Sequence, residues 1–147
     1  MADALTAAAR LSGSELKRAA THLLTFTGLP GRGDFARHTT LAWAEVPGTG
    51  RALAAEVDLT AVRDDEKLLL TGSDEHLLNL ALSYSRGRPV HLDAYLNVFG
   101  HQTAQRVLEA HVIGMGMEGF LTVSAGGPEL DKLNALHAEL GIGKDDQ

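Results

Sequence analysis

The sequence contains no cysteine, and this absence narrows the chemistry open to the protein. Disulfide bonds, thiolate metal sites and a thiol nucleophile all require a cysteine side chain, so each of them is excluded. A chain without cysteine suits a reducing compartment, and we expect a cytoplasmic protein. The first residues support this expectation, because Asp3 stands where a secretory signal would carry basic charge.

Long apolar runs and excess positive charge are also missing. No apolar segment approaches the ~20 residues of a membrane-spanning helix, so we expect no membrane partner. The 13 lysines and arginines are outnumbered by 19 aspartates and glutamates, which leaves a formal net charge of −6. No long-range attraction therefore draws the chain to phosphate backbones, and we expect no nucleic-acid partner.

The signature motifs of common enzymes are absent as well. The sequence contains neither the phosphate-binding motif G-x-x-x-x-G-K-[ST] nor the G-x-S-x-G turn of a serine hydrolase. It also lacks H-E-x-x-H, so we predict no metal site. No motif identifies a cofactor.

What the sequence does contain is the composition of an ordinary globular protein. The 147 residues are 44% hydrophobic and 22% charged, as in typical globular domains. A chain of this length can bury about 70% of its unfolded surface within one core. We therefore expect a single domain over residues 1–147, with residues 1–11 as a looser helical arm.

Helical periodicity marks four segments. Ser12 followed by Glu15 forms a capping box at the start of a helix over residues 12–27, and Gly28 stands where a left-handed C-cap belongs. Apolar side chains recur at helical spacing in three further segments. These are residues 74–87, 100–114 and 128–141.

Alternation of apolar and polar residues predicts strands elsewhere. Residues 39–46 and 51–62 flank the turn sequence PGTG and predict a β-hairpin. In its second strand we expect Leu53, Ala55 and Val57 to face the core. Three more segments are predicted to be strands, two of them from short apolar runs and one, the middle segment, from unbroken alternation. These are residues 67–71, 90–99 and 119–125, of which 90–99 also fits a helix through Leu92, Leu96 and Phe99.

The alternation also bears on fold class, because strands of a parallel sheet covered on both faces are apolar throughout. We therefore predict an α+β fold in two layers. Its mixed or mainly antiparallel sheet has about five strands, with helices packed mainly on one face. A three-layer α/β fold is the alternative. The open sheet face would be solvated or covered by a second copy, so we expect a homo-oligomer, with a dimer favoured.

Two histidines are candidates for catalysis. His91 and Asp93 are two residues apart on the predicted strand, so both side chains project from one face. A carboxylate beside an imidazole orients it and raises its pKa, which suits general-base catalysis. His101, just after this strand, is the second candidate. The alternatives for this row are a solvated strand face or a subunit interface.

Three glycine-containing loops lead from a predicted strand into a predicted helix, whose free N–H groups could hold an anion. If the three strands run in one direction, these loops share one edge of the sheet and line one pocket. The residues concerned are Ser73, His76, His101, Gln102, Thr103, Ser124, Gly126 and Gly127. The alternative is that these residues only cap helices and form turns.

The glycine-rich stretch TGLPGRGDFARH, residues 27–38, joins the first long helix to the first strand. Its G-x-x-G-x-G spacing follows a helix, whereas a dinucleotide-binding loop follows a strand. We interpret the stretch as a joint that could also close over a bound anion through Arg32 and Arg37.

Two functions remain open at this stage. The first is a small, soluble, non-enzymatic domain that self-associates and binds a small anionic ligand or a protein partner. The second is a small enzyme that uses His91 with Asp93, or His101, in acid–base chemistry on an anionic substrate. The sequence holds no dense group of catalytic residue types, which favours the first.

Overall fold

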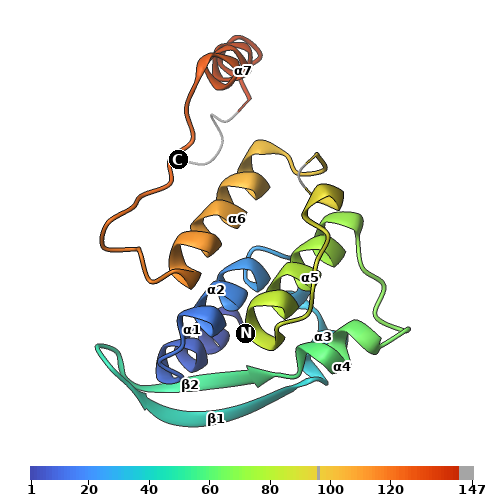
Figure 1. The fold of residues 1–147 in the computed structure, drawn as a ribbon, viewed down its shortest axis with the longest axis vertical. Coiled ribbons are helices and arrows are strands. Elements are labelled where there is room, and N and C mark those ends of the chain that lie inside the picture. Colours follow the sequence, from blue (N-terminus) through green and yellow to red (C-terminus); the bar gives the residue numbers. More distant parts are fainter. Residues whose placement is uncertain (96, 143–147) are drawn as a thin grey trace.

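The computed structural model describes residues 1–95 and 97–142, and within them the fold is α+β with helices dominant (Figure 1). These residues form seven α-helices, two short 3-10 helices and one two-stranded antiparallel sheet. In chain order the elements are α1 (Ala2–Leu11), α2 (Glu15–Leu24), η1 (Leu29–Gly31), α3 (Gly33–Ala36), β1 (Thr39–Val46), β2 (Gly50–Val57), α4 (Leu59–Asp64), α5 (Gly72–Arg86), η2 (Leu92–Ala94), α6 (His101–Gly114) and α7 (Pro128–Glu139).

The core lies where α2 packs against α5 and α6 (Figure 1). Leu23 of α2, Leu78 of α5 and Phe35 of α3 are completely buried there. At the end of α6, Gly114 has no side chain, and a Cβ at this position would lie 3.2 Å from the Tyr84 ring of α5. The absence of that Cβ lets α6 approach closely. Each fully buried leucine or phenylalanine contributes roughly 1.5–3 kcal/mol of transfer free energy.

The N-terminal helix α1 packs on one face of the β-hairpin. Ala7 of α1 is buried against Val46 of β1 and Ala54 of β2. Alanines on both elements keep the side chains short, so the helix lies close to the sheet. Leu5, also on α1, joins the main core. Residues 2–11 therefore connect the hairpin to the helical core.

The predicted five-stranded sheet is wrong, and so is the three-layer alternative. The α+β class and the hairpin are confirmed, with β1 and β2 paired from Thr39 opposite Val57 to Val46 opposite Gly50. Residues 67–71, 90–99 and 119–125 form no strand in the part that the structure describes. A period of two indicates amphipathicity, but a strand also needs a neighbour to pair its N–H and C=O groups. In 90–99, a 3-10 turn forms instead, with Ala94 N–H bonded to the His91 carbonyl, and Leu96 lies outside the described residues.

The second hairpin strand is shorter than predicted, because a helix begins after Val57. The Asp58 side chain accepts hydrogen bonds from the backbone N–H groups of Thr60 and Ala61, and so caps α4. Along β2, Ala55 is buried as expected. Leu53, however, is exposed beside Trp43 of β1.

All four predicted helices are present. The first, α2, is shorter at both ends than the predicted segment 12–27. Ser14, not Ser12, caps α2 by accepting from the Lys17 N–H. Gly28 is not a left-handed cap, because its φ is −73° and α2 ends before it. Gly87 does end α5 in the left-handed region, with φ of 65°. The helices predicted over 100–114 and 128–141 correspond to α6 and α7.

The C-terminal segment stands apart from the rest. Within residues 119–142 no residue is fully buried. Figure 1 shows α7 beyond the start of α6, at the end of the molecule opposite the hairpin. In the described part of the chain, no helix combines the length and apolar character needed to span a membrane.

Candidate ligand-binding site

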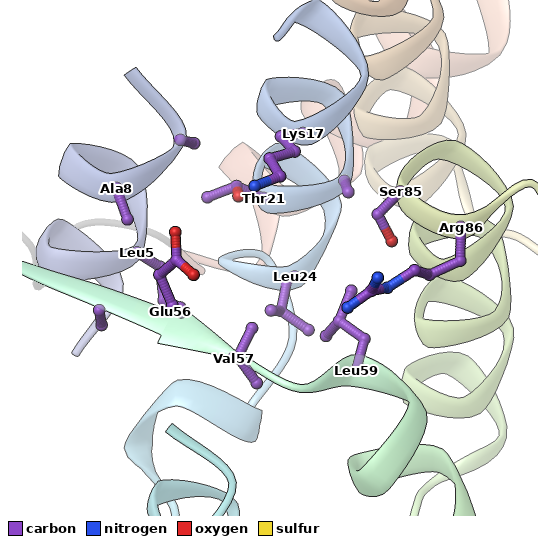
Figure 2. A pocket seen from close by; sticks show the side chains of 13 residues that line it. Leu5, Ala8, Lys17, Thr21, Leu24, Glu56, Val57, Leu59, Ser85 and Arg86 are labelled. Atoms are coloured by element: carbon purple, nitrogen blue, oxygen red, sulfur yellow. The ribbon is translucent and has the colours of Figure 1, made fainter. Parts of the chain in front are cut away.

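A cavity of about 160 Å³ lies where α1, α2, the end of β2 and the end of α5 meet (Figure 2). Its floor is apolar and comes from four elements. The floor residues are Leu5, Ala8, Ala9, Ala20, Leu24, Ala55, Val57 and Leu59. Its rim is polar, with two cations, two hydroxyls and one carboxylate. The rim residues are Lys17, Thr21, Ser85, Arg86 and Glu56.

Helical spacing explains how the rim is built. Lys17 and Thr21 are four residues apart on α2 and therefore lie on the same face, one turn from each other. Ser85 and Arg86 belong to the last turn of α5, which Gly87 ends. Figure 2 shows the Arg86 guanidinium extending from α5 toward the apolar floor. Two helix faces thus direct their polar groups into one space.

The two cations of the rim have no carboxylate partner within residues 1–95 and 97–142. Among the described residues, neither Lys17 nor Arg86 forms an ion pair, whereas Arg32 pairs with Asp34 and most other described arginines also have carboxylate partners. Figure 2 shows Glu56, the one acidic group of the rim, on the β2 side, away from Arg86. Two positive groups and one negative group leave the lining at +1, in a chain whose formal net charge is −6.

Ser85 has the least satisfied polar group of this site. Its hydroxyl oxygen is shielded from solvent and has no hydrogen-bond partner among the described residues. A buried hydroxyl without a partner costs about 1–3 kcal/mol relative to one that is bonded. If the side chain turns toward the cavity that it lines, a ligand atom would provide the partner, and Ser85 would then supply a donor and an acceptor at the site.

The catalytic candidates from the sequence lie elsewhere. His91 is the N-cap of the 3-10 turn η2 and Asp93 lies within the turn; both are exposed, and the argument that a strand places them on one face does not apply. His101 is the exposed first residue of α6. No hydrogen bond or ion pair joins these three side chains in the described structure.

The structure brings part of the predicted ligand-binding set together. His101, Ser124 and Gly126 line a hollow of about 440 Å³ between the start of α6 and the segment leading into α7. Gln102 and Thr103 lie in the first turn of α6, and Gly127 precedes α7. Ser73 and His76 lie near the start of α5. The His76 ring packs edge-on against the Tyr95 ring, with the two ring centres 4.8 Å apart. No sheet edge connects these positions, because the strands expected before them are absent from the described residues.

Arg32 and Arg37, the two arginines expected to close over a bound anion, are held by carboxylates. Arg32 donates two hydrogen bonds to Asp34, at 2.9 and 2.6 Å, and these bonds lower the pKa of the Asp34 carboxyl. A guanidinium nitrogen of Arg37 lies 3.7 Å from a carboxylate oxygen of Asp65. The pKa of Asp65 is also lowered, chiefly by its hydrogen bond with His38. Completely buried Phe35 lies between these pairs in the sequence and anchors the stretch to the core.

A pair that the sequence did not suggest joins α2 to α6. His22 Nε2 lies 2.7 Å from a Glu109 carboxylate oxygen, and Gln105 donates to the other oxygen at 3.0 Å. Burial lowers the pKa of His22, so the imidazole is neutral near pH 7 and donates its Nε2 proton to the ionised carboxylate. His22 lines a polar cavity of about 320 Å³ with Arg10 and Arg18. The partners are far apart in the sequence, so no spacing pattern could reveal them.

The described residues contain no group of three histidine, cysteine, aspartate or glutamate side chains placed to hold a metal ion. Comparisons with protein-family models, curated proteins and solved structures found no match. The geometry of the molecule therefore carries the functional argument.

Proposed function

We propose that the protein is a non-enzymatic binding domain, which holds a small organic anion in the cavity between α1, α2, β2 and α5. The observation that supports this proposal is a pair of cations, Lys17 and Arg86, which have no ion pair in the part of the chain that the structure describes and lie at the rim of one apolar-floored cavity. The chain as a whole is acidic, so the positive lining of this cavity would favour an anion over a cation. The cysteine-free composition supports a cytoplasmic location for this binding.

The cavity's chemistry defines the class of ligand. A carboxylate can accept two parallel hydrogen bonds from the Arg86 guanidinium and one from the Ser85 hydroxyl. Leu24 and Leu59 offer apolar surface to a short aliphatic chain. A cavity near 150 Å³ holds a benzene-sized molecule, so the 160 Å³ here suits a ligand of about six to seven non-hydrogen atoms. Short-chain carboxylates such as butanoate and pentanoate have these properties.

A thermal-shift titration with pentanoate tests the proposal. A ligand that binds only the folded state stabilises it by about 2.7 kcal/mol at 100 times its Kd. For a domain of this size that corresponds to a rise in Tm of roughly 5–10 °C. Pentanamide, which has the same shape without the charge, should produce little shift.

The Arg86→Gln variant should lose the pentanoate response. Arg88→Gln is the matched control, because Arg88 lies two residues further along, is exposed and does not line the cavity. An equal response to pentanoate in all three proteins, or to the amide and the carboxylate alike, would reject charge-based recognition in this cavity.

The His22–Glu109 pair supports a second candidate function, acid–base chemistry on an anionic substrate. The carboxylate orients the ring through Nε2, which leaves the Nδ1 lone pair free to accept a proton. Arg18 in the same cavity is paired with Glu118, and Arg10, which forms no ion pair among the described residues, would attract a negatively charged substrate. Hydrolysis of phosphate and carboxylate esters by the wild type, lost in His22→Gln with unchanged Tm, would establish this function. Absence of turnover over the whole ester panel would count against it.

A further inference from the structure

The glycine-rich stretch GMGMEG, residues 114–119, returns the chain from the end of α6 to α2. Gly116 lies in the left-handed region, with φ of 69°. This turn lets the Met117 N–H bond to a carbonyl five residues back in α6, at 3.0 Å. Glu118 follows directly, and its carboxylate pairs with Arg18 of α2. The stretch therefore ends one helix and places a carboxylate against another.

This carboxylate lies in the polar cavity of about 320 Å³ that His22 lines. Arg10 of α1, Arg18 of α2 and Arg106 of α6 line the same cavity. Among the described residues of the lining, Glu118 supplies the one carboxylate. Because burial keeps His22 neutral near pH 7, three arginines and one glutamate leave the lining at +2. The cavity therefore has positive charge that its own carboxylate does not balance.

The three arginines differ in how firmly the chain holds them. Arg106 donates to a backbone carbonyl of α2 at 2.8 Å, and its guanidinium lies 3.8 Å from a Glu109 oxygen, so its charge is balanced. Arg10 forms no ion pair in the described part of the chain. The side chains of the Arg18–Glu118 pair are 37% and 40% exposed. Ion pairs this open to water contribute little to stability, so Arg18 can exchange Glu118 for another anion.

A phosphate group matches this cavity better than a single carboxylate does. It carries about −1.5 to −2 charges near pH 7 and has three acceptor oxygens, and a guanidinium can bond two of them at once. Arg18 can hold one pair of oxygens while Arg10 supplies the second positive charge. The volume is about twice that of a cavity that holds a benzene-sized molecule. A small organic group therefore has room beside the phosphate.

We propose that this polar cavity binds inorganic phosphate or the phosphate group of a small monoester, which takes the place of the Glu118 carboxylate on Arg18. Glu118 is then the resident anion of the empty site. The site is distinct from the pentanoate cavity, because the two share part of one wall but neither Ser85 nor Arg86 lines the polar cavity. It also requires no turnover, so it stands whether or not His22 performs acid–base chemistry.

Displacement of Glu118 should loosen the chain that follows it. Glu118 leads directly into residues 119–142, none of which is fully buried. The N–H groups of Phe120 and Leu121 both bond to the Met117 carbonyl at 2.9 Å, in a turn that contains Glu118. Phosphate should therefore speed the hydrogen exchange of these two amides several-fold, because exchange requires this turn to open.

Calorimetric titration with inorganic phosphate, at an ionic strength held constant with sodium chloride, tests the site. The wild type should bind phosphate saturably. Arg18→Gln should raise the Kd about 10-fold, because it removes a charge-assisted bond, and Arg10→Gln should raise it several-fold. Arg88→Gln removes the same charge outside the cavity, so this matched control should bind as the wild type does. No saturable binding by the wild type, or an unchanged Kd in either cavity variant, overturns the proposal.

Glu118→Gln tests the displacement itself. Without the competing carboxylate, phosphate should bind several-fold more tightly, and the Phe120 and Leu121 amides should exchange quickly even when phosphate is absent. Glu139→Gln removes the same charge on α7, outside the cavity, and should change neither quantity. The proposal is overturned if Glu118→Gln binds phosphate no more tightly than Glu139→Gln, or if phosphate leaves the exchange of the two wild-type amides unchanged.

Ethyl phosphate identifies the source of the phosphate group. Tighter binding of ethyl phosphate than of inorganic phosphate assigns a monoester, and the opposite order assigns the free ion; either order upholds the site. Arg18→Gln should keep the wild-type response to pentanoate, so failure of this site and failure of the proposed function are measured separately. Each variant should also keep the wild-type circular dichroism, so that unfolding is not mistaken for lost binding.

Discussion

Replacing Ser85 with alanine tests the cavity most sharply, because the substitution should stabilise the protein without ligand and weaken its binding of the ligand. The Ser85 hydroxyl has no partner among the described residues and is shielded from solvent. Its removal relieves part of the roughly 1–3 kcal/mol cost of an unbonded buried hydroxyl. Alanine is also the better helix former at this position in α5, by a few tenths of a kcal/mol.

We therefore expect Ser85→Ala to raise the free energy of unfolding by about 0.5–1.5 kcal/mol. At about 2–4 °C for each kcal/mol, Tm should rise by roughly 1–6 °C in the absence of ligand. Urea denaturation followed by circular dichroism measures the change, and an unchanged m-value shows that the unfolded state is not the cause. A loss of more than about 1 kcal/mol would refute the reasoning, since it would mean that the hydroxyl is already well bonded.

With ligand present, the same variant should behave in the opposite way. If the bound carboxylate accepts a hydrogen bond from Ser85, the variant loses a bond to a charged group, worth about 1.5–3 kcal/mol. The Kd for pentanoate should then rise about 10-fold or more. An unchanged Kd would place the carboxylate away from Ser85.

Three further predictions follow from neighbouring groups. Glu56→Gln removes a carboxylate from the cavity rim and should strengthen pentanoate binding by a few-fold in calorimetry; weaker binding would instead indicate a ligand with a positive group of its own. Burial raises the pKa of Tyr84 to about 12, so the folded state keeps a phenol proton that the unfolded chain releases near pH 10. Stability should fall by on the order of 1 kcal/mol between about pH 10 and 12, and Tyr84→Phe should lack the tyrosinate absorbance step near pH 12. Burial lowers the pKa of His22 below 6.5, so the unfolded state binds more protons than the folded state below about pH 6.5. Lowering the pH from 6.5 should therefore reduce the free energy of unfolding. The lowered pKa of Glu109 adds a further loss below about pH 4.5. A His22→Gln variant should lose the first step and weaken the second, because the hydrogen bond with His22 is the largest of the interactions that lower the Glu109 pKa.

The hairpin and the helices could be predicted because their signals are local. Alternation on both sides of PGTG specifies two strands that are also each other's partners, so the pairing needs nothing distant. Gly87 and Pro128 end or begin helices through their own backbone preferences. These elements depend on residues within a few positions of each other.

The three missing strands show where local pattern fails. Residues 90–99 alternate without interruption, yet alternation indicates only that two faces differ in polarity. No second strand lies beside this segment in the described structure to satisfy its backbone, so the chain turns at η2 instead. Asp58 shows the same ambiguity, because it fits the polar phase of a strand and also the cap of a helix, and capping prevails.

The candidate cavity was out of reach of the sequence for a different reason. Lys17 and Thr21 share a helix face, as periodicity would suggest, but Glu56 and Arg86 come from β2 and α5. Only the tertiary packing of α1, α2 and α5 brings these groups to one space. The His22–Glu109 pair depends on packing in the same way, because it joins α2 to α6.

The most direct test of the binding proposal is an NMR titration with pentanoate that reports where the ligand lies. The account predicts saturable shifts in the Ser85 amide and in the methyl groups of Leu24 and Leu59, which line the cavity. Pentanamide at the same concentration should leave these signals nearly unchanged. Shifts that do not saturate, or that fall around His22 rather than on the cavity residues, would contradict the account.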